Sequence, residues 1–230
     1  MVDFITNSFR IRMRSVIIVT KDNLELVGYM KEKGMEMQRL MSYYRCAIME
    51  IETKFKVLNE EYSLQHDRNP INSIKSRLKA FPSIVEKMER KGFELSADSI
   101  EQNLNDVAGI RIICAFEEDV YTLADALLRQ DDITLIRRKD YIQNPKDNGY
   151  RSLHLIVSVP IFLNNEKRIM KVEIQLRTIA MDCWASLEHQ LRYKKNHKAD
   201  EEIEQELLEC AQLSFELDER MDKLRDSIID

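Results

Sequence analysis

Hydrophobic residues recur at helical spacing near both ends of the chain and at strand spacing in its middle. In the first part they follow one another at intervals of three and four residues, which predicts one apolar stripe on a long helix. The residues of this stripe are Met37, Leu40, Tyr44, Ala47, Ile51, Phe55 and Leu58. From Glu201 to Ile228 mostly helical spacing returns on a very acidic background, and it predicts a second long helix.

Between these helical regions the sequence changes to short apolar and β-branched runs. A short helix is expected to begin at Pro82, and a longer one passes through Val120 and Leu128. Strands are expected at 74–78, 110–116, 133–138, 152–159 and 168–176. Strands and helices alternate irregularly, so we expect an α/β (α+β) fold with one mixed sheet of about five strands flanked by helices.

Length and composition are compatible with one sizeable core. The chain has 230 residues, of which 44 % are hydrophobic, and no Gly/Ser-rich or Pro-rich stretch indicates a linker. Its longest apolar runs are far shorter than the roughly 20 residues of a membrane span, and its N-terminus does not resemble a secretory signal. We therefore expect a cytoplasmic protein with a single domain over 23–230 and an N-terminal extension of unknown role at 1–22.

The distribution of charge is more informative than the net charge of −5. Residues 66–92 contain seven Lys or Arg and three acidic residues, whereas residues 200–230 contain twelve acidic residues and three basic ones. A basic island in an acidic protein suggests a small polyanionic ligand such as a nucleotide, and it argues against DNA, which needs an extended basic face.

Three cations alternate through the first predicted strand. Lys75, Arg77 and Lys79 are spaced by two, so their side chains share one face and repel one another unless an anion compensates them. Lys87 on the following helix could join the same cluster. The alternative is a solvated edge strand that its charges protect from pairing, and the spacing leaves both interpretations open.

The last predicted strand alternates regularly between apolar and polar residues. Its polar face carries Glu173, Gln175 and Arg177. Spacing alone favours an ordinary solvent-facing strand over the floor of a polar cleft.

Three further residues are candidates for chemistry. Asp106 directly precedes an apolar strand, where its carboxylate could hold a hard cation or could simply cap a turn. Tyr150 and His154 are four residues apart and would share one strand face if the strand starts immediately at Tyr150, where an aromatic ring could stack on a base or simply pack against its neighbours.

Six segments in order resemble motifs of the RelA/SpoT synthetase domain over about residues 70–195. They are 74–79 with 83–87, 106–111 (Asp-Val-Ala-Gly-Ile-Arg), 137–142 (Arg-Arg-Lys-Asp-Tyr-Ile), 148–154 (Asn-Gly-Tyr-Arg-Ser-Leu-His), 172–178 (Val-Glu-Ile-Gln-Leu-Arg-Thr) and 184–189 (Trp-Ala-Ser-Leu-Glu-His). The resemblance implies a nucleotidyltransferase-like synthetase fold. The length and the helical ends make the chain similar to a small alarmone synthetase, which has no hydrolase domain. No hydrolase activity is expected, and His66 is interpreted as a surface residue.

The resemblance also implies a reaction and a set of site residues. The 3′ hydroxyl of GDP or GTP would attack the β phosphorus of ATP and release AMP, the reaction of a GTP diphosphokinase. Asp106 and Glu173 would hold Mg²⁺, and Glu173 would also act as general base. The residues expected to bind ATP are Lys75, Arg77, Lys79, Lys87, Arg111 and Lys139. The residues expected to bind GDP or GTP are Tyr150, His154, Gln175, Arg177 and Asp182.

Two alternatives to this reading stay open on the sequence. The acceptor could be an adenine nucleotide or an RNA 3′ end, or the chain could be a non-catalytic oligomer that binds nucleotide or RNA. Tyr150 argues for guanine, and so does Asp182, although Asn is expected at that position in some relatives. The resemblance further implies a homotetramer, and no membrane partner is expected.

Overall fold

The structure is a computed structural model that describes residues 21–66, 68–193 and 201–229. The expected extension at 1–22 lies outside these residues except for its last two positions, and the side chain of His66 is not described. The chain divides into two compact units, residues 1–39 and 40–230. The sheet and all the candidate site residues belong to the second unit.

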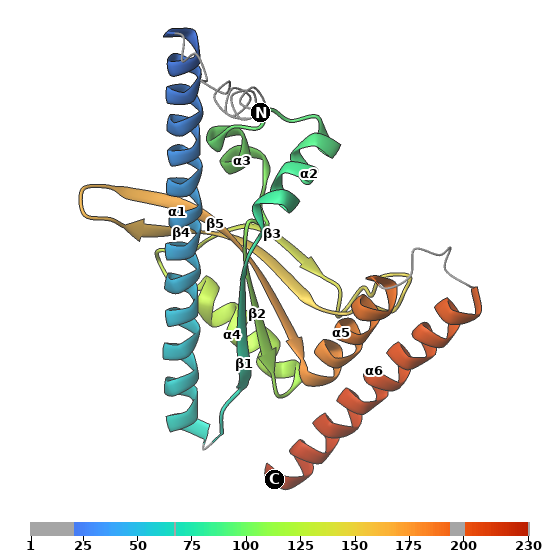
Figure 1. The fold of residues 1–230 in the computed structure, drawn as a ribbon. Helices are drawn as coiled ribbons and strands as arrows, with labels where there is room; N and C mark the ends of the chain where they lie inside the picture. Colours follow the sequence, from blue (N-terminus) through green and yellow to red (C-terminus); the bar gives the residue numbers. More distant parts are fainter. Residues whose placement is uncertain (1–20, 67, 194–200, 230) are drawn as a thin grey trace, which may run out of the picture. The chain divides into compact units, whose positions relative to one another are not determined.

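Helices and strands alternate along the described chain, with helices at both ends (Figure 1). Their order is α1 (Lys21–His66), β1 (Ile71–Leu78), α2 (Phe81–Lys91), α3 (Ala97–Asn103), β2 (Ala108–Cys114), α4 (Glu117–Leu128), β3 (Thr134–Asp140), β4 (Leu153–Phe162), β5 (Lys167–Thr178), α5 (Ile179–Tyr193) and α6 (Glu201–Ile229). All five predicted strands are present, and the two long terminal helices are confirmed.

The five strands form one mixed sheet in the order β1-β2-β5-β4-β3. Strands β2 and β5 pair in parallel, and every other neighbouring pair is antiparallel. Strand β5, the last strand in the sequence, therefore lies in the middle of the sheet, next to both β2 and β4. This arrangement confirms the predicted mixed sheet flanked by helices.

One face of the sheet is packed in the core and the other carries polar residues. Val172, Ile174 and Leu176 of β5 are fully buried, as their alternation predicted. Five residues of the predicted stripe on α1 are also buried, which agrees with the stripe's role in packing. They are Leu40, Tyr44, Ala47, Ile51 and Phe55.

Two helices, α3 and α5, were not predicted from periodicity. Helix α3 has only seven residues, too few to show an apolar stripe, and contacts at its two ends stabilise it. At its start the Ser96 hydroxyl accepts from the Ser99 amide at 3.2 Å. At its end Lys171 of β5 donates to the backbone carbonyls of Glu101 and Gln102, each at 2.9 Å.

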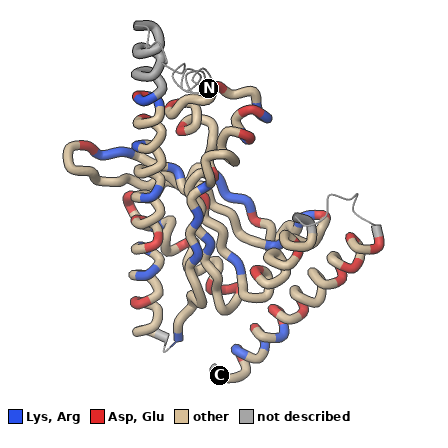
Figure 2. Tube along the Cα trace, viewed as in Figure 1, with Lys and Arg blue, Asp and Glu red and all other residues tan. Residues whose placement is uncertain are grey.

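Helix α6 packs beside α5 but leaves much of its apolar stripe exposed (Figure 1). Leu217, Leu224 and Ile228 are all at least half exposed. Figure 2 shows acidic residues spaced along this helix and basic residues on strands of the sheet. No described helix is long and apolar enough to cross a membrane.

Candidate active site

The polar face of the sheet carries two neighbouring rows of residues that run across all five strands. The first row consists of direct strand partners, which lie side by side on one face of a sheet. From β1 to β3 its members are Lys75, Arg111, Gln175, His154 and Lys139. Strand pairing thus brings together residues that are up to 100 positions apart in the chain, and three of the five are cationic.

The second row is offset from the first by two residues on each strand, on the same face of the sheet. Its members are Arg77, Gly109, Glu173, Ile156 and Arg137. Gly109 has no side chain, so space remains between Arg77 on one side and Glu173 on the other. Glu173 therefore occupies the middle of the polar face, with cations toward both edges of the sheet.

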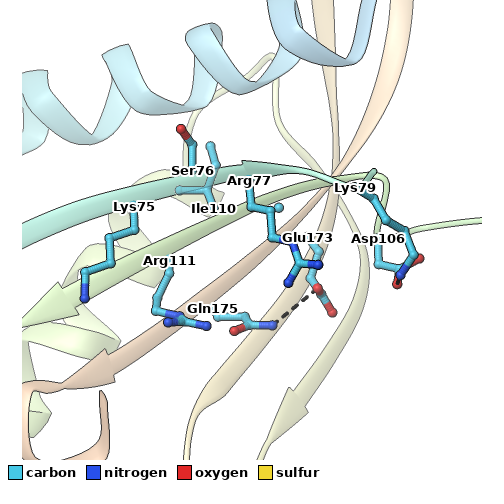
Figure 3. A pocket seen from close by; sticks show the side chains of 10 residues that line it. Lys75, Ser76, Arg77, Lys79, Asp106, Ile110, Arg111, Glu173 and Gln175 are labelled. Carbon is cyan, nitrogen blue, oxygen red and sulfur yellow. Dashed lines mark hydrogen bonds and ion pairs between the residues drawn. The ribbon is translucent and has the colours of Figure 1, made fainter. Parts of the chain in front are cut away.

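A pocket of about 360 Å³ opens over β1, β2 and β5, and we call it the β1 pocket. Lys75, Arg77 and Lys79 all line it, which agrees with the face predicted for them. Figure 3 shows that Arg77 and Glu173 point into the same space, with Asp106 beside Lys79. Strand β5 is therefore the floor of a polar cleft here, and the interpretation of its polar face as an ordinary solvent-facing surface was wrong.

A second pocket, of about 340 Å³, lies toward β3, and we call it the β3 pocket. Five basic side chains line it together with two aromatic rings, Tyr141 and His154. The basic residues are Lys87, Lys91, Arg137, Lys139 and Lys146. Asp106 and Glu173 line both pockets, so the two carboxylates mark the place where the pockets meet.

Asp106 is the anion that compensates part of the basic cluster. Its Oδ2 accepts from Lys79 at 3.0 Å and from Lys87 at 2.7 Å. Burial raises the pKa of Asp106, but the two lysines outweigh burial and hold this pKa below its usual value. Its Oδ1 is buried and has no hydrogen-bond partner among the described residues. This oxygen is free to take a further ligand.

Asp106 and Glu173 suit Mg²⁺ better than they suit a metal ion whose ligands all come from the protein. No cluster of three or more His, Cys, Asp or Glu side chains that could hold a metal occurs in the described ranges. Mg²⁺ usually binds one or two carboxylates and completes its shell with water and substrate phosphates. The unpartnered oxygen of Asp106, with Glu173 lining the same pocket, fits that pattern.

Glu173 has the environment of a proton acceptor. Burial and then the charge of Asp106 raise its pKa, against weaker opposing effects of Gln175, Lys87 and Lys79. Its Oε2 accepts from Gln175 at 3.3 Å. A carboxylate with a raised pKa accepts a proton more readily at neutral pH than a surface carboxylate does.

His154 lies beside Glu173 but does not pair with it by charge. Burial and then the nearby Arg177, with other cations, lower the pKa of His154 to about 3, so the ring is neutral near pH 7. The approach of 3.9 Å between its Nδ1 and Glu173 is therefore not an ion pair. Its Nε2 is 2.8 Å from the hydroxyl of Tyr150, so these two residues lie together. Tyr150 precedes β4, however, so the expected shared strand face is not formed.

Arg177 connects the residues that were expected to bind GDP or GTP. Its side chain is 2 % exposed. It donates to Gln175 at 2.7 Å and to the Tyr150 hydroxyl at 3.3 Å, and it lies 3.5 Å from Asp182. Arg177 lines neither pocket, and this geometry suits a residue that orders its neighbours.

Asp182, at the start of α5, is surrounded by cations. Its Oδ2 accepts from Lys75 at 2.9 Å, and its Oδ1 accepts from Arg111 at 3.2 Å. Both oxygens are thus engaged, and Asp182 lines neither pocket. The guanine contact expected of Asp182 stays a prediction.

The two pockets divide the expected site residues differently from the ATP-binding and GDP- or GTP-binding sets that the sequence predicted. Lys75, Arg77, Lys79 and Arg111 share the β1 pocket, and Gln175 lies there too. Lys87 and Lys139 were expected with the same ATP-binding set, but they line the β3 pocket. Lys139 reaches that pocket because its strand partner is His154.

Sequence reasoning did not single out several residues of the β3 pocket. Lys146 is the clearest, since its ammonium lies 4.7 Å from the ring centre of Tyr141 and 4.6 Å from that of Tyr150. Both tyrosines belong to segments that resemble family motifs, and Lys146 lies in the loop between those two segments. The available signal was thus a basic residue four positions before the expected base-stacking tyrosine.

The family model for the region found in RelA / SpoT proteins matches residues 76–198. The chain belongs to the RelA/SpoT family. A relative from Bacillus subtilis (strain 168), named GTP pyrophosphokinase YwaC, is 47 % identical over 178 residues, which are 77 % of this chain and 85 % of the relative. These findings confirm the family predicted from the sequence motifs.

Solved structures of this RelA/SpoT group confirm the fold. The small alarmone synthetase 2 of B. subtilis superposes with a TM-score of 0.76 at 42 % identity and covers 84 % of this chain and 99 % of its own. The small alarmone synthetase 1 of the same organism, bound to its product pppGpp, has a TM-score of 0.76 at 34 % identity over 84 % and 98 % of the two chains. Its complex with AMPCPP, an ATP analogue, has a TM-score of 0.71 at 32 % identity over the same shares.

Proposed function

We propose that this chain is a small alarmone synthetase, a GTP pyrophosphokinase that converts ATP and GDP or GTP into AMP and ppGpp or pppGpp. The observation that carries the proposal is the pair of basic pockets that meet at Asp106 and Glu173. A transfer between two nucleotides needs two phosphate-binding sites that share one reacting centre. The names of the chain's relatives, and the pppGpp and AMPCPP complexes of one of them, agree with this reading.

The β1 pocket would receive ATP. Arg77 makes no ion pair with any described residue, so its guanidinium is free for phosphate oxygens. Lys75, Lys79 and Arg111 are neutralised by Asp182 and Asp106, and they would shift part of their hydrogen bonding to the triphosphate. Cations spread over several phosphate oxygens offset the charge that makes attack on phosphorus slow.

The β3 pocket would receive GDP or GTP. Lys87, Lys139 and Lys146 line this pocket and would bind its 5′ phosphates. Tyr150 does not line the pocket but lies beside Lys146, and from there it would stack on guanine. The neutral ring of His154 would offer a hydrogen bond to the ribose or a phosphate without adding charge. Arg177 would hold Tyr150 in place from behind the pocket.

In the reaction, the acceptor's 3′ oxygen would form a bond to the β phosphorus of ATP while the bond from that phosphorus to the α,β-bridging oxygen breaks. AMP leaves with that oxygen, and the proton of the 3′ hydroxyl passes to Glu173, whose raised pKa suits this role. Asp106 and Glu173 would hold Mg²⁺, which supplies positive charge against the phosphates of the donor. Without these two carboxylates the pockets would still bind nucleotides but would lack a shared centre.

The exposed apolar stripe of α6 is the natural surface for self-association, so the proposal includes a homo-oligomer, with the homotetramer as the expected form. It also includes a cytoplasmic location, where ATP and GTP are available. Light scattering on the purified protein measures the number of subunits directly.

Product analysis tests the proposed activity. Purified protein is incubated with Mg²⁺, labelled ATP and GDP or GTP, and the nucleotides are separated by chromatography. The expected products are AMP and a guanosine 3′-pyrophosphate, and Glu173→Gln should lower their rate by roughly 100-fold or more. Glu94→Gln, the same change at an exposed carboxylate outside both pockets, is the matched control. Transfer only to adenine nucleotides or tRNA would overturn the guanine acceptor, and no reaction with any acceptor would favour a binding protein.

A further inference from the structure

Helix α6 contacts the residues that flank the acceptor side of the site. Asp218 of α6 is buried, and its Oδ2 accepts two hydrogen bonds from the body of the protein. One donor is the Arg151 guanidinium at 3.2 Å, and the other is the Thr178 hydroxyl at 2.9 Å. Arg151 directly follows Tyr150, and Thr178 directly follows Arg177, so a single carboxylate anchors the chain next to both residues.

The other neighbour of Tyr150 also lies against α6. Gly149 has a φ of +83°, and a Cβ built on it would lie 2.4 Å from the Cβ of Ala211 and 3.3 Å from Leu208. Any side chain at position 149 would therefore collide with the helix, and the backbone conformation itself favours glycine. The loop before Tyr150 is thus in close contact with α6.

These contacts come from one face of the helix. Ala211, Phe215 and Asp218 are spaced by four and three residues, which places them on one side of α6. Phe215 lies under the Arg151 guanidinium, 4.7 Å from its central carbon to the ring centre. Arg151 is therefore held between the ring of Phe215 and the carboxylate of Asp218.

Arg151 depends strongly on these partners because it is buried. Its side chain is 7 % exposed, and its Nε and Nη1 have no hydrogen-bond partner among the described residues. Glu117 gives it one further contact, at 3.3 Å. Removal of the charge of Asp218 would leave a buried guanidinium with a single weak counter-charge, so the loop that carries Tyr150 would shift or loosen.

From this geometry we propose that Asp218 is a positioning residue for the acceptor nucleotide, which makes α6 part of the guanine site without contact to the ligand. The inference rests on the proposed function, since it assumes that Tyr150 and Arg177 serve the GDP or GTP pocket. Asp218 acts through Arg151 on Tyr150 and through Thr178 on Arg177. Asp218, Arg151, Thr178 and Tyr150 do not line the β1 pocket, and Arg177 reaches it through Gln175, so ATP binding is expected to change less than acceptor binding.

The test is the steady-state kinetics of Asp218→Asn, a change that keeps the shape and removes the charge. The KM for GDP and GTP should rise about tenfold, while the KM for ATP should stay within about twofold. Asp226→Asn makes the same change at an exposed carboxylate of the same helix, which pairs with Arg225, and it should leave both KM values unchanged. A merely structural role of Asp218 would lower the active fraction, and hence kcat, without this split between the two substrates.

A second variant guards against a failure of Asp218→Asn to fold. Thr178→Val removes only the hydroxyl that donates to Asp218 and to which the Met181 amide donates, and it keeps the side-chain volume. A selective rise in the acceptor KM in either folded variant supports the proposal. Equal KM values for the acceptor in Asp218→Asn, Thr178→Val and wild type would overturn it. Failure of the wild-type protein to form the guanosine product would instead refute the proposed function, so the two failures are distinguishable.

Discussion

Asp106→Asn should separate nucleotide binding from catalysis. In the wild-type protein the carboxylate neutralises two ammonium groups, Lys79 at 3.0 Å and Lys87 at 2.7 Å. These lysines lie in different pockets, and each is only about one-fifth exposed. The substitution keeps the size of the side chain and one acceptor oxygen, but it removes the negative charge from the centre of the site.

The substitution is expected to lower kcat but to strengthen the binding of ATP without metal. Loss of one preorganised charge at a reacting centre typically costs about 100- to 1,000-fold in kcat, or about 3–4 kcal/mol. Binding of ATP without metal should instead improve, because the triphosphate no longer meets a carboxylate between the lysines. A residual interaction of about 1 kcal/mol between partly screened charges corresponds to roughly fivefold tighter binding.

Two measurements test this separation. Isothermal titration calorimetry with ATP in EDTA gives the Kd without metal, and single-turnover formation of AMP with Mg²⁺ gives the chemical rate. Asp98→Asn is the matched control, since Asp98 is exposed on α3 and lines neither pocket. Circular dichroism establishes that each variant is folded before the values are compared.

The reasoning would be refuted if ATP bound at least tenfold more weakly to Asp106→Asn while the chemical rate fell by less than tenfold. That result would make Asp106 a contact for the nucleotide rather than a counter-charge and metal ligand. An equal fall in the single-turnover rate of the Asp98→Asn control would indicate a general effect of removing one negative charge from the protein.

Two further predictions follow from the buried ionisable groups. The ring of His154 should stay neutral, so its NMR signals should not titrate between pH 5 and 8. Because this histidine takes up a proton near pH 6.5 in the unfolded state but only near pH 3 in the folded state, the free energy of unfolding should fall as pH drops from 6.5 toward 3. A ring that titrates near pH 6.5 would contradict the burial and the cationic surroundings seen here. Glu173→Gln should raise the Tm of the ligand-free protein at pH 7, because burial raises the pKa of Glu173 and its charged form therefore costs stability. The difference should shrink as pH falls toward 4.5, because the raised pKa of folded Glu173 means that it takes up its proton above the ordinary value of a glutamate. A lower Tm of the variant at pH 7 would contradict this account.

The strands could be predicted because their local sequence carries the necessary information. In β5, Val172, Ile174 and Leu176 alternate with polar residues, and all three are buried as that period requires. The helix α3 has no comparable pattern. Its stability depends on Ser96 at one end and on Lys171, about 70 positions away, at the other, and no local window contains both.

The identity of the site residues was predicted better than their grouping. The alternation of Lys75, Arg77 and Lys79 placed them on one face, and they line one pocket. The position of Lys139 depends on the pairing of β3 with β4, which a sequence read alone does not determine. That register sets Lys139 beside His154 and away from the predicted ATP-binding cluster.

The polar face of β5 shows the same limit in another form. Glu173 and Gln175 look like residues of an ordinary exposed strand until their neighbours are known. Because β5 lies between β2 and β4, both side chains face a cleft bounded by cations from other strands. The anchoring of Arg151 by Asp218, 67 positions later, is equally invisible to local patterns.

The central claim is that two pockets bind two different nucleotides and share Asp106 and Glu173. Its most direct test is the measurement of KM for ATP and for GTP in Arg77→Ala and in Lys139→Ala, since each residue lines only one of the two pockets. The account predicts that Arg77→Ala raises the KM for ATP about tenfold and leaves that for GTP within about threefold, and that Lys139→Ala does the reverse. An increase in the KM for ATP in Lys139→Ala, without a change for GTP, would contradict it.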